Sequence, residues 1–296
     1  MSADPAVNLR TPLEKAAFDY YDNKRNDPLN LGLGSTDGYY HHHFAVGDFN
    51  PRVLTLTGEE RERAINTELH RMETRQVDVL TQALGDVPST ARILDGGSGR
   101  GGTAFLLHRA FGCQVDGINI SAYQNAFARR QAEEHGCADQ VRFHDRNMAA
   151  TGFPDASFDC VVTNETTMYV DLYETFAEFA RLLKPGGHYA LLTWCNNDAL
   201  DPHPPQTEAI DEHYCCHTHS RSTYLRALID TGLIPYQVDD LTQAAIPYWE
   251  LRSHSSLATG IETPYLSAYR SDCVNYMRIV SRRRPALSTR PPARPH

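Results

Sequence analysis

The sequence lacks long apolar runs: nowhere do about 18 consecutive residues have the apolar character of a membrane-spanning helix. Residues 1–10 also lack the apolar core of a secretory signal, so we expect no export of the chain. The seven cysteines are odd in number and show no C-x-x-C spacing, which is typical of reduced thiols rather than of a disulfide framework. Together these absences predict a cytoplasmic protein with no membrane partner.

Positive charge is also scarce, because 28 Lys and Arg residues stand against 37 Asp and Glu residues, for a formal net charge of −9. Nonspecific nucleic-acid binding depends on clustered Lys and Arg, so this balance argues against a nucleic-acid partner. It does not exclude a small anionic substrate held by local cations. At 296 residues and 41 % apolar composition, the chain can form one α/β domain of about 200 residues with additions.

Apolar runs alternate with amphipathic segments through most of the chain, which predicts an α/β fold with a mostly parallel sheet. We expect strands near 91–95, 114–118, 141–144, 158–163, 189–194, 233–241 and 273–280. We expect helices at 13–23, 59–84, 102–111, from Ser121 onward, 172–183, 206–215, 222–230 and within 248–269. Residues 30–38 are expected to form a loop, and 184–187 (Lys-Pro-Gly-Gly) a turn.

This pattern predicts three parts. Residues 1–85 would form an N-terminal helical cap with a substrate-covering loop. Residues 86–281 would form the core, with lid insertions near 200–220 and 245–270. Residues 282–296, rich in Arg and Pro, would be a disordered tail.

A glycine-rich turn follows the first predicted core strand, with the sequence Asp95-Gly-Gly-Ser-Gly-Arg-Gly-Gly102. Glycines allow positive φ and let the backbone approach a ligand closely. A strand, glycines and a helix are shared with dinucleotide sites, but the acid two residues before the first glycine of the Gly-x-Gly-x-Gly series resembles motif I of class I S-adenosylmethionine-dependent methyltransferases. That resemblance makes Asp95, Gly97, Gly99 and Gly101 candidate cofactor contacts.

Further cofactor candidates follow the next two strands, where carboxyl ends face a ligand. Asn119 and Gln124 come after the second strand, although Gln124 can also be read as a solvated helix residue. Asn147 and Met148 come after the third strand, where they would meet an adenine. The pattern Gly-x-x-x-Ser-x-x-Gln, from Gly117 to Gln124, resembles methyltransferases that alkylate alkene carbons, such as cyclopropane-forming and sterol enzymes.

The fourth strand ends in Asn164-Glu165, which places a carboxylate at the ligand-facing edge of the sheet. A carboxylate in this position is a candidate acid/base or a stabiliser of positive charge. The alternative is that Glu165 only caps the next helix.

Five other segments carry a more specific pattern: Asp37-Gly-x-Tyr-His-His-His43, Asn164-Glu-x-x-Met-Tyr-Val-Asp-Leu172, His219-Ser-Arg221, Pro247-Tyr-Trp-Glu-Leu-Arg252 and Ser255-Ser-Leu-x-Thr-Gly-Ile-Glu262. Over about residues 20–280 they resemble geranyl diphosphate C-methyltransferases, which methylate C2 of geranyl diphosphate using S-adenosylmethionine and Mg²⁺. The resemblance implies a Rossmann-like class I methyltransferase fold with a seven-stranded sheet, and a homo-oligomer.

The resemblance also implies roles for residues. It places Glu165 near the reacting carbons as the base, with the substrate diphosphate as a second candidate, and the aromatic side chains Tyr214, Tyr169 and Phe44 beside a carbocation. Candidates for the diphosphate are Tyr40, His41, His42, His43, Arg221 and Arg252. Mg²⁺ would be held largely by the diphosphate and water, since this ion dehydrates reluctantly.

Four departures from the family pattern concern the acceptor and the cofactor turn. Gly32 replaces an arginine, Phe44 a tyrosine, Tyr214 a phenylalanine, and Gly96-Gly-Ser98 an Ala-Gly-Cys sequence. We therefore predict C-methylation of an isoprenoid diphosphate through a tertiary carbocation and deprotonation, with isopentenyl diphosphate giving a six-carbon homologue. Geranyl diphosphate is the alternative acceptor. A small-molecule O- or N-methyltransferase, or a noncatalytic S-adenosylmethionine-binding protein, is a more distant alternative.

Overall fold

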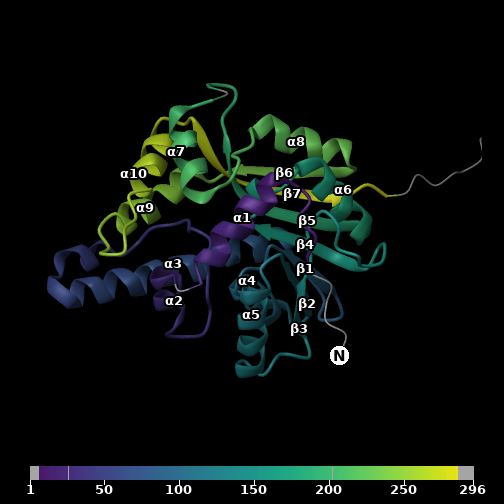
Figure 1. The fold of residues 1–296 in the computed structure, drawn as a ribbon, viewed down its shortest axis with the longest axis horizontal. Helices are drawn as coiled ribbons and strands as arrows, with labels where there is room; N and C mark the ends of the chain where they lie inside the picture. Colours follow the sequence, from purple (N-terminus) through teal and green to yellow (C-terminus); the bar gives the residue numbers. More distant parts are fainter. Residues whose placement is uncertain (1–6, 26, 202, 286–296) are drawn as a thin grey trace, which may run out of the picture.

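A mixed seven-stranded sheet forms the centre of the computed structural model, which describes residues 7–25, 27–201 and 203–285 (Figure 1). The strands are β1 (Arg92–Gly96), β2 (Gln114–Asn119), β3 (Val141–Asp145), β4 (Phe158–Asn164), β5 (Leu183–Asn196), β6 (Leu233–Asp240) and β7 (Val274–Arg283). Their order is β3-β2-β1-β4-β5-β7-β6, with β1 to β5 parallel and β7 antiparallel to both neighbours. The predicted mostly parallel seven-stranded sheet is confirmed.

Helices cover both faces of this sheet because successive strand residues point to opposite sides. Ile93 packs with α3 (Gly58–Leu84), α4 (Gly102–Phe111) and α5 (Ala122–Glu134). Its neighbour Leu94 packs on the other side with α6 (Leu172–Leu182) and α8 (Arg221–Asp230). The strands are thus buried on both faces, which is the reason for their nearly continuous apolar sequences.

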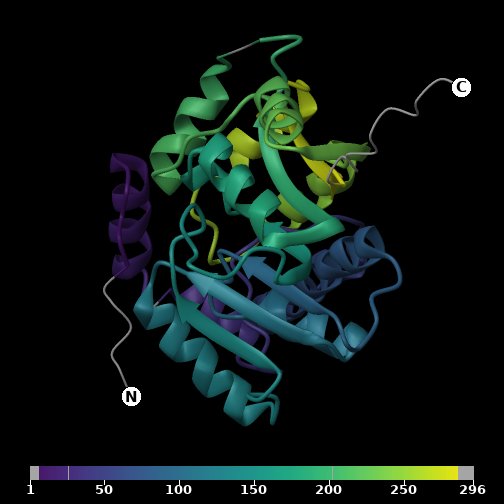
Figure 2. The same cartoon turned by 90° about the vertical axis from the view of Figure 1, so that its right-hand side faces the viewer.

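The remaining helices gather beyond the carboxyl ends of the parallel strands. They are α1 (Pro12–Asn23), α2 (Pro28–Gly34), α7 (Pro205–Tyr214), α9 (Thr242–Arg252) and α10 (Glu262–Arg270), with short 3₁₀ turns at Pro51–Thr55 and Thr167–Tyr169. In Figure 1, α7, α9 and α10 lie together at the upper left. Figure 2 shows α1, in purple, along one flank of the molecule.

The loop expected at 30–38 is wrong in its first half, where α2 forms. Asp27 caps this helix, because its side chain accepts hydrogen bonds from the backbone N–H groups of Leu29 (3.0 Å) and Asn30 (3.4 Å). Pro28 occupies the first turn, where its missing N–H costs nothing. A side-chain cap followed by proline therefore starts a helix that the glycines at 32 and 34 obscure in the sequence.

Three further boundaries differ from expectation. The turn predicted at 184–187 lies inside β5 as a bulge, where the pairing with β4 jumps from Leu183 to His188. The helical region expected within 248–269 is two helices, α9 and α10, with residues 253–261 between them. Strand β7 continues to Arg283, where Arg282 pairs with His188 and Ile234, so the expected tail begins within the sheet. Residues 286–296 of that tail lie outside the described residues.

Two simple expectations can be compared with the fold. All seven cysteines are free thiols, as their spacing suggested. Within the described ranges, no helix has the length and apolar character that crossing a membrane requires.

Candidate active site

A cavity of about 900 Å³, open solvent at its mouth included, lies at the carboxyl ends of β1, β2 and β4. The glycine turn lines this cavity. The turn is held against β2, because the N–H groups of Gly97 and Ser98 donate to the carbonyl of Ile118 near the end of that strand (2.8 and 3.0 Å). Gly97 has φ +75°, and a Cβ there would lie 2.6 Å from Thr166 Cγ2. Only glycine fits this position without displacing Thr166.

The structure brings together nearly all of the predicted cofactor residues. The cavity is lined by Asp95, Gly97, Gly99, Asn119, Gln124, Asn147 and Met148. Gly101 does not line it: with φ +94° it precedes α4, and a Cβ there would lie 2.7 Å from Phe143. Its role is to let the helix begin against that ring.

Asp95 makes this cavity suited to a ligand with hydroxyl or amine donors. Its side chain is 1 % exposed, and Oδ2 has no hydrogen-bond partner among the residues that the structure describes. Burial raises the pKa of Asp95 to about 7. A buried carboxyl oxygen without a partner is costly unless a bound molecule supplies a donor. The side chains of Asn119 and Gln124 hydrogen-bond to each other at 2.7 Å on the same wall.

Two further residues line this cavity but were not predicted as site residues: Glu14 on α1 and Arg100 in the glycine turn. Glu14 is 3 % exposed and its carboxylate accepts a hydrogen bond from Asn147 Nδ2 at 2.8 Å. Arg100, within the glycine turn, donates to the backbone carbonyl of Arg25 (3.1 Å) and to His42. The sequence did give an indication for Glu14, because this acid borders the apolar face of α1 that includes Ala17.

Glu165 is held in a constrained conformation at the inner wall of the cavity. Its backbone has φ +55°, which is uncommon for a residue with a side chain. The Phe44 N–H donates to Oε1 (3.1 Å) and Oε2 (3.0 Å), and the Tyr276 hydroxyl donates to Oε1 at 2.5 Å. Burial raises the pKa of Glu165 to about 8, and the Tyr276 hydrogen bond offsets part of that rise. Glu165 therefore does not merely cap a helix.

A second cavity adjoins the first and combines aromatic rings with cations. Its walls include Tyr20, Tyr21, Lys24, Asp27, Asn30, His42, His43, Phe44, His213, Tyr214 and Arg252. Tyr21, His42 and His43 line both cavities, so the two spaces meet at these side chains. Lys24 was not among the predicted site residues; its Nζ lies 4.4 Å from the centroid of the Tyr20 ring. Its local sequence, polar and at a helix end, carries no signal of this role.

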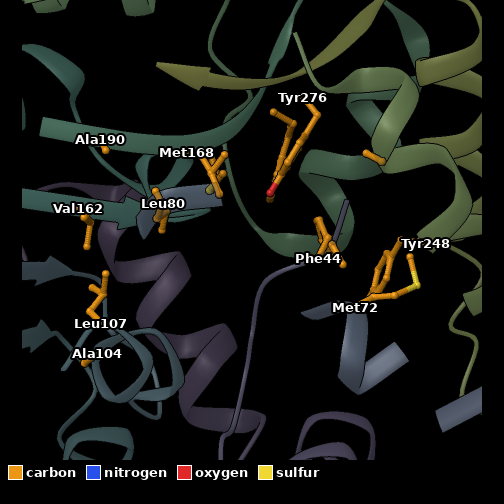
Figure 3. Close-up of a cluster of buried hydrophobic side chains, with 14 of the residues drawn as sticks. Phe44, Met72, Leu80, Ala104, Leu107, Val162, Met168, Ala190, Tyr248 and Tyr276 are labelled. Atoms are coloured by element: carbon orange, nitrogen blue, oxygen red, sulfur yellow. The ribbon is translucent and has the colours of Figure 1, made fainter. Parts of the chain in front are cut away.

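The three predicted aromatic residues divide between the cavities. Phe44 and Tyr214 line the second cavity, with ring centroids 5.9 Å apart. The Phe44 ring also contacts Trp249 at 4.3 Å between centroids. Tyr169 lines the first cavity, and its hydroxyl hydrogen-bonds to that of Tyr21 at 2.8 Å. Figure 3 shows Phe44 among buried hydrophobic side chains, near Met72 and Tyr248.

The three consecutive histidines, of which His41 and His43 are buried and His42 is half-buried, are hydrogen-bonding groups rather than fixed positive charges. His43 Nδ1 donates to the Phe44 carbonyl (2.8 Å), so its Nε2 accepts from His41 Nδ1 (3.1 Å). Burial lowers the pKa of His43 to about 4 and holds those of His41 and His42 well below their usual range. In this state the histidines carry no charge, and the single N–H groups of His41 and His43 are already bonded within the protein. Tyr40 lines the first cavity beside them.

The two predicted arginines have different positions. Arg252 lines the second cavity and its Nε pairs with Glu262 Oε1 at 3.0 Å. Arg221 lines neither cavity, because its guanidinium is bound to the side chains of Asn197 (3.0 Å) and Asn275 (3.3 Å) at the start of α8. The expected contact of Arg221 with a diphosphate does not fit this position. Gly32 is exposed on α2, outside both cavities.

Metal ligands were left open by the sequence. Within the described parts of the chain, no group of three or more His, Cys, Asp or Glu side chains is placed to hold a metal ion. Asp27 is the carboxylate on the second cavity, and its oxygens already accept from Leu29 N–H and the Asn30 side chain.

Comparison with known proteins identifies the family. The methyltransferase domain family matches residues 93–187. A geranyl diphosphate 2-C-methyltransferase of Saccharopolyspora erythraea is 44 % identical over 263 residues, 89 % of this chain and 92 % of the relative. One of Streptomyces coelicolor is 39 % identical, over 92 % of this chain and 94 % of the relative. A solved geranyl diphosphate methyltransferase complex with geranyl diphosphate and sinefungin superposes with a TM-score of 0.89 at 40 % identity, covering 92 % of this chain and 100 % of that chain. The chain therefore belongs to the geranyl diphosphate 2-C-methyltransferase family of class I S-adenosylmethionine-dependent methyltransferases.

Proposed function

We propose that this protein transfers a methyl group from S-adenosylmethionine to C2 of geranyl diphosphate. The observation that carries the proposal is the position of Glu165, a buried carboxyl on the cofactor-type cavity, bound to the backbone of Phe44 on the aromatic cavity. From the sequence we expected isopentenyl diphosphate first, whereas the relatives are named for geranyl diphosphate. Their names and the solved complexes support the geranyl alternative.

The first cavity would hold the cofactor, since Asp95 offers it an unpartnered carboxyl oxygen and the glycine turn offers close backbone. When bound, S-adenosylmethionine would supply an electrophilic methyl group to the alkene carbon, and its sulfur would be left as a neutral thioether. The protein must align the alkene with that methyl at about 3–3.5 Å. Tyr21, His42 and His43 mark the junction where the two would meet.

Methylation at C2 leaves a tertiary carbocation at C3, which the second cavity is suited to stabilise. The faces of Phe44 and Tyr214 would contribute on the order of 2 kcal/mol each through cation–π interaction in a desolvated site. Glu165 would then remove the C2 proton, restoring the C2–C3 double bond. The positive cofactor nearby would favour its carboxylate form, offsetting the burial that raises its pKa.

The diphosphate would lie toward the cationic wall of the second cavity. Lys24 and Arg252 provide positive charge there, and His42 a hydrogen-bonding group. Mg²⁺ keeps several waters and binds phosphates with few protein carboxylates. Asp27 is a carboxylate on this cavity that such an ion could reach through water.

One observation favours isopentenyl diphosphate as a second candidate acceptor. Tyr214 carries a phenol where the family pattern has phenylalanine, and its ring lies 6.3 Å from Tyr20 and 5.9 Å from Phe44. These three rings line the second cavity together, and the additional hydroxyl of Tyr214 leaves less room there, which suits a shorter chain. A homo-oligomer also belongs to this proposal and is tested by light scattering of the purified protein.

The test is an incubation of the purified protein with S-adenosylmethionine, Mg²⁺ and isopentenyl, dimethylallyl or geranyl diphosphate, singly and in equimolar competition, with products read by mass. We expect 2-methylgeranyl diphosphate as the preferred product. Preference for the five-carbon acceptor would support the second candidate, and no methylated product from any of them would refute both. Glu165→Gln should lower kcat by about 10²- to 10⁴-fold, the range for loss of a general base.

A further inference from the structure

A chain of buried hydrogen bonds reaches Glu165 from two distant segments, α3 and β7. Tyr276 donates its hydroxyl proton to Glu165 Oε1 at 2.5 Å, and Gln76 Nε2 donates to the Tyr276 oxygen at 2.5 Å. Gln76 and Tyr276 are both fully buried. In Figure 3 the Tyr276 ring extends from its strand with the hydroxyl directed into the interior. Neither residue lines either of the two cavities described above, so neither would touch a substrate bound there.

The direction of this chain is set by Asn164, the residue before Glu165. Its amide forms a reciprocal pair with that of Gln76: Asn164 Nδ2 donates to Gln76 Oε1 (3.0 Å) and Gln76 Nε2 donates to Asn164 Oδ1 (3.2 Å). Asn164 Nδ2 also donates to Thr103 Oγ1 (3.2 Å). This arrangement turns the Gln76 N–H toward Tyr276. Because a hydroxyl carries one proton, the Tyr276 proton must then point to Glu165.

The two oxygens of Glu165 are consequently unequal. Oε1 receives the Phe44 N–H (3.1 Å), the Tyr276 hydroxyl and a long contact from Gln76 Nε2 (3.4 Å). Oε2 receives the Phe44 N–H alone (3.0 Å). The oxygen with the fewer donors keeps more of its lone-pair capacity for a proton from a ligand.

We infer that Tyr276 and Gln76 are positioning residues, which hold Glu165 by Oε1 and leave Oε2 to take the substrate proton. The inference rests on the proposed function, in which Glu165 is the base. Without the Tyr276 donor, the carboxylate form of Glu165 loses its shortest hydrogen bond, and the protein would need a higher pH to ionise it.

Other groups also act on the Glu165 charge and stay in place in the test. Glu73 on α3 raises the pKa of Glu165, whereas Arg252 on α9 and the Phe44 N–H lower it. Tyrosine hydroxyls around it come from several elements: Tyr21 on α1, Tyr214 on α7, Tyr265 and Tyr269 on α10, and Tyr276 on β7. A comparison of variants at one position therefore isolates the Tyr276 contribution.

The decisive experiment is the pH profile of kcat for Tyr276→Phe, with the diphosphate acceptor that the wild type methylates. We expect the acidic limb to move up by about one to two pH units, the shift that corresponds to one hydrogen bond to a charged group. Near pH 7, kcat should fall about 10- to 100-fold and recover at high pH, with KM for the acceptor unchanged. The matched control is Tyr189→Phe, which removes an equally buried hydroxyl bonded to Thr163 at 2.8 Å in the sheet.

A second variant tests the direction of the hydrogen bonds from Gln76 through Tyr276 to Glu165. In Gln76→Glu an acceptor replaces the amide donor, so the Tyr276 proton turns away from Glu165; the new carboxyl beside Oε1 also repels the Glu165 charge, and both effects move the acidic limb up. The part that depends on the Tyr276 proton is the part of this shift that Gln76→Glu no longer produces in a Tyr276→Phe background. Binding of S-adenosylhomocysteine and thermal unfolding check that each variant is folded. A fall in kcat that is equal at all pH values, or a Tyr276→Phe profile that matches Tyr189→Phe, would overturn the inference. An inactive wild type would instead refute the proposed function.

Discussion

Replacing Glu165 by Gln should change how the stability of the ligand-free protein depends on pH. Burial raises the pKa of Glu165 from its ordinary 4.5 to about 8 in the folded state. Between these values the folded protein keeps a proton that the unfolded chain has lost, so stability decreases as pH rises. One such carboxyl contributes up to about 1.4 kcal/mol per pH unit. From about pH 5.5 to 7.5, this amounts to at most about 3 kcal/mol.

The measurement is urea unfolding of wild type and Glu165→Gln at both pH values and constant ionic strength. Stability of the wild type should fall more steeply with pH, while Glu73, whose pKa burial also raises to about 8, leaves part of the slope in the variant. Glu68→Gln is the control, because hydrogen bonding to Arg71 lowers the pKa of Glu68 and its titration lies below this range. Parallel pH profiles for wild type and Glu165→Gln would refute the claim that folded Glu165 holds its proton at neutral pH.

Two further variants test the cofactor turn and the cationic wall. Gly97→Ala should destabilise the protein by about 1–3 kcal/mol more than Gly112→Ala. Both substitutions force alanine into a left-handed conformation, but only the Cβ at position 97 meets Thr166. Equal losses of stability in urea unfolding would contradict the close approach of Gly97 to Thr166. Lys24→Met should raise KM for the diphosphate about tenfold with little change in S-adenosylhomocysteine affinity, because a charge-assisted contact is lost; an unchanged KM in steady-state kinetics would place the diphosphate elsewhere.

Local patterns predicted much of the core correctly because they depend on neighbouring residues. The apolar run before Asp95 forms β1, and the glycines after it do take positive φ at Gly97, Gly99 and Gly101. The same local patterns gave wrong boundaries at two places, one decided by a capping side chain and the other by a β-bulge. Asp27 caps a helix in a glycine-containing segment, and the bulge within β5 keeps the Lys184 turn inside a strand.

The candidate site could be predicted only in part. Asp95, Asn119 and Glu165 lie at the carboxyl ends of β1, β2 and β4, and parallel strands bring these ends to one edge, so sequence position alone places them together. Arg221 was expected at the diphosphate from the family resemblance, but its guanidinium is bound by Asn197 and Asn275, and no spacing in the sequence indicates those contacts.

By itself, the sequence determined the strands, the glycine turn and the position of the Glu165 carboxyl at the end of a strand, because each depends on a short stretch of chain. Tertiary structure decided how that carboxyl is held. Gln76 and Tyr276 are 200 residues apart, yet both reach Glu165, because α3 packs on the sheet and β7 pairs beside β5. Such contacts depend on the burial of whole helix and strand faces, which no local spacing of residues reports.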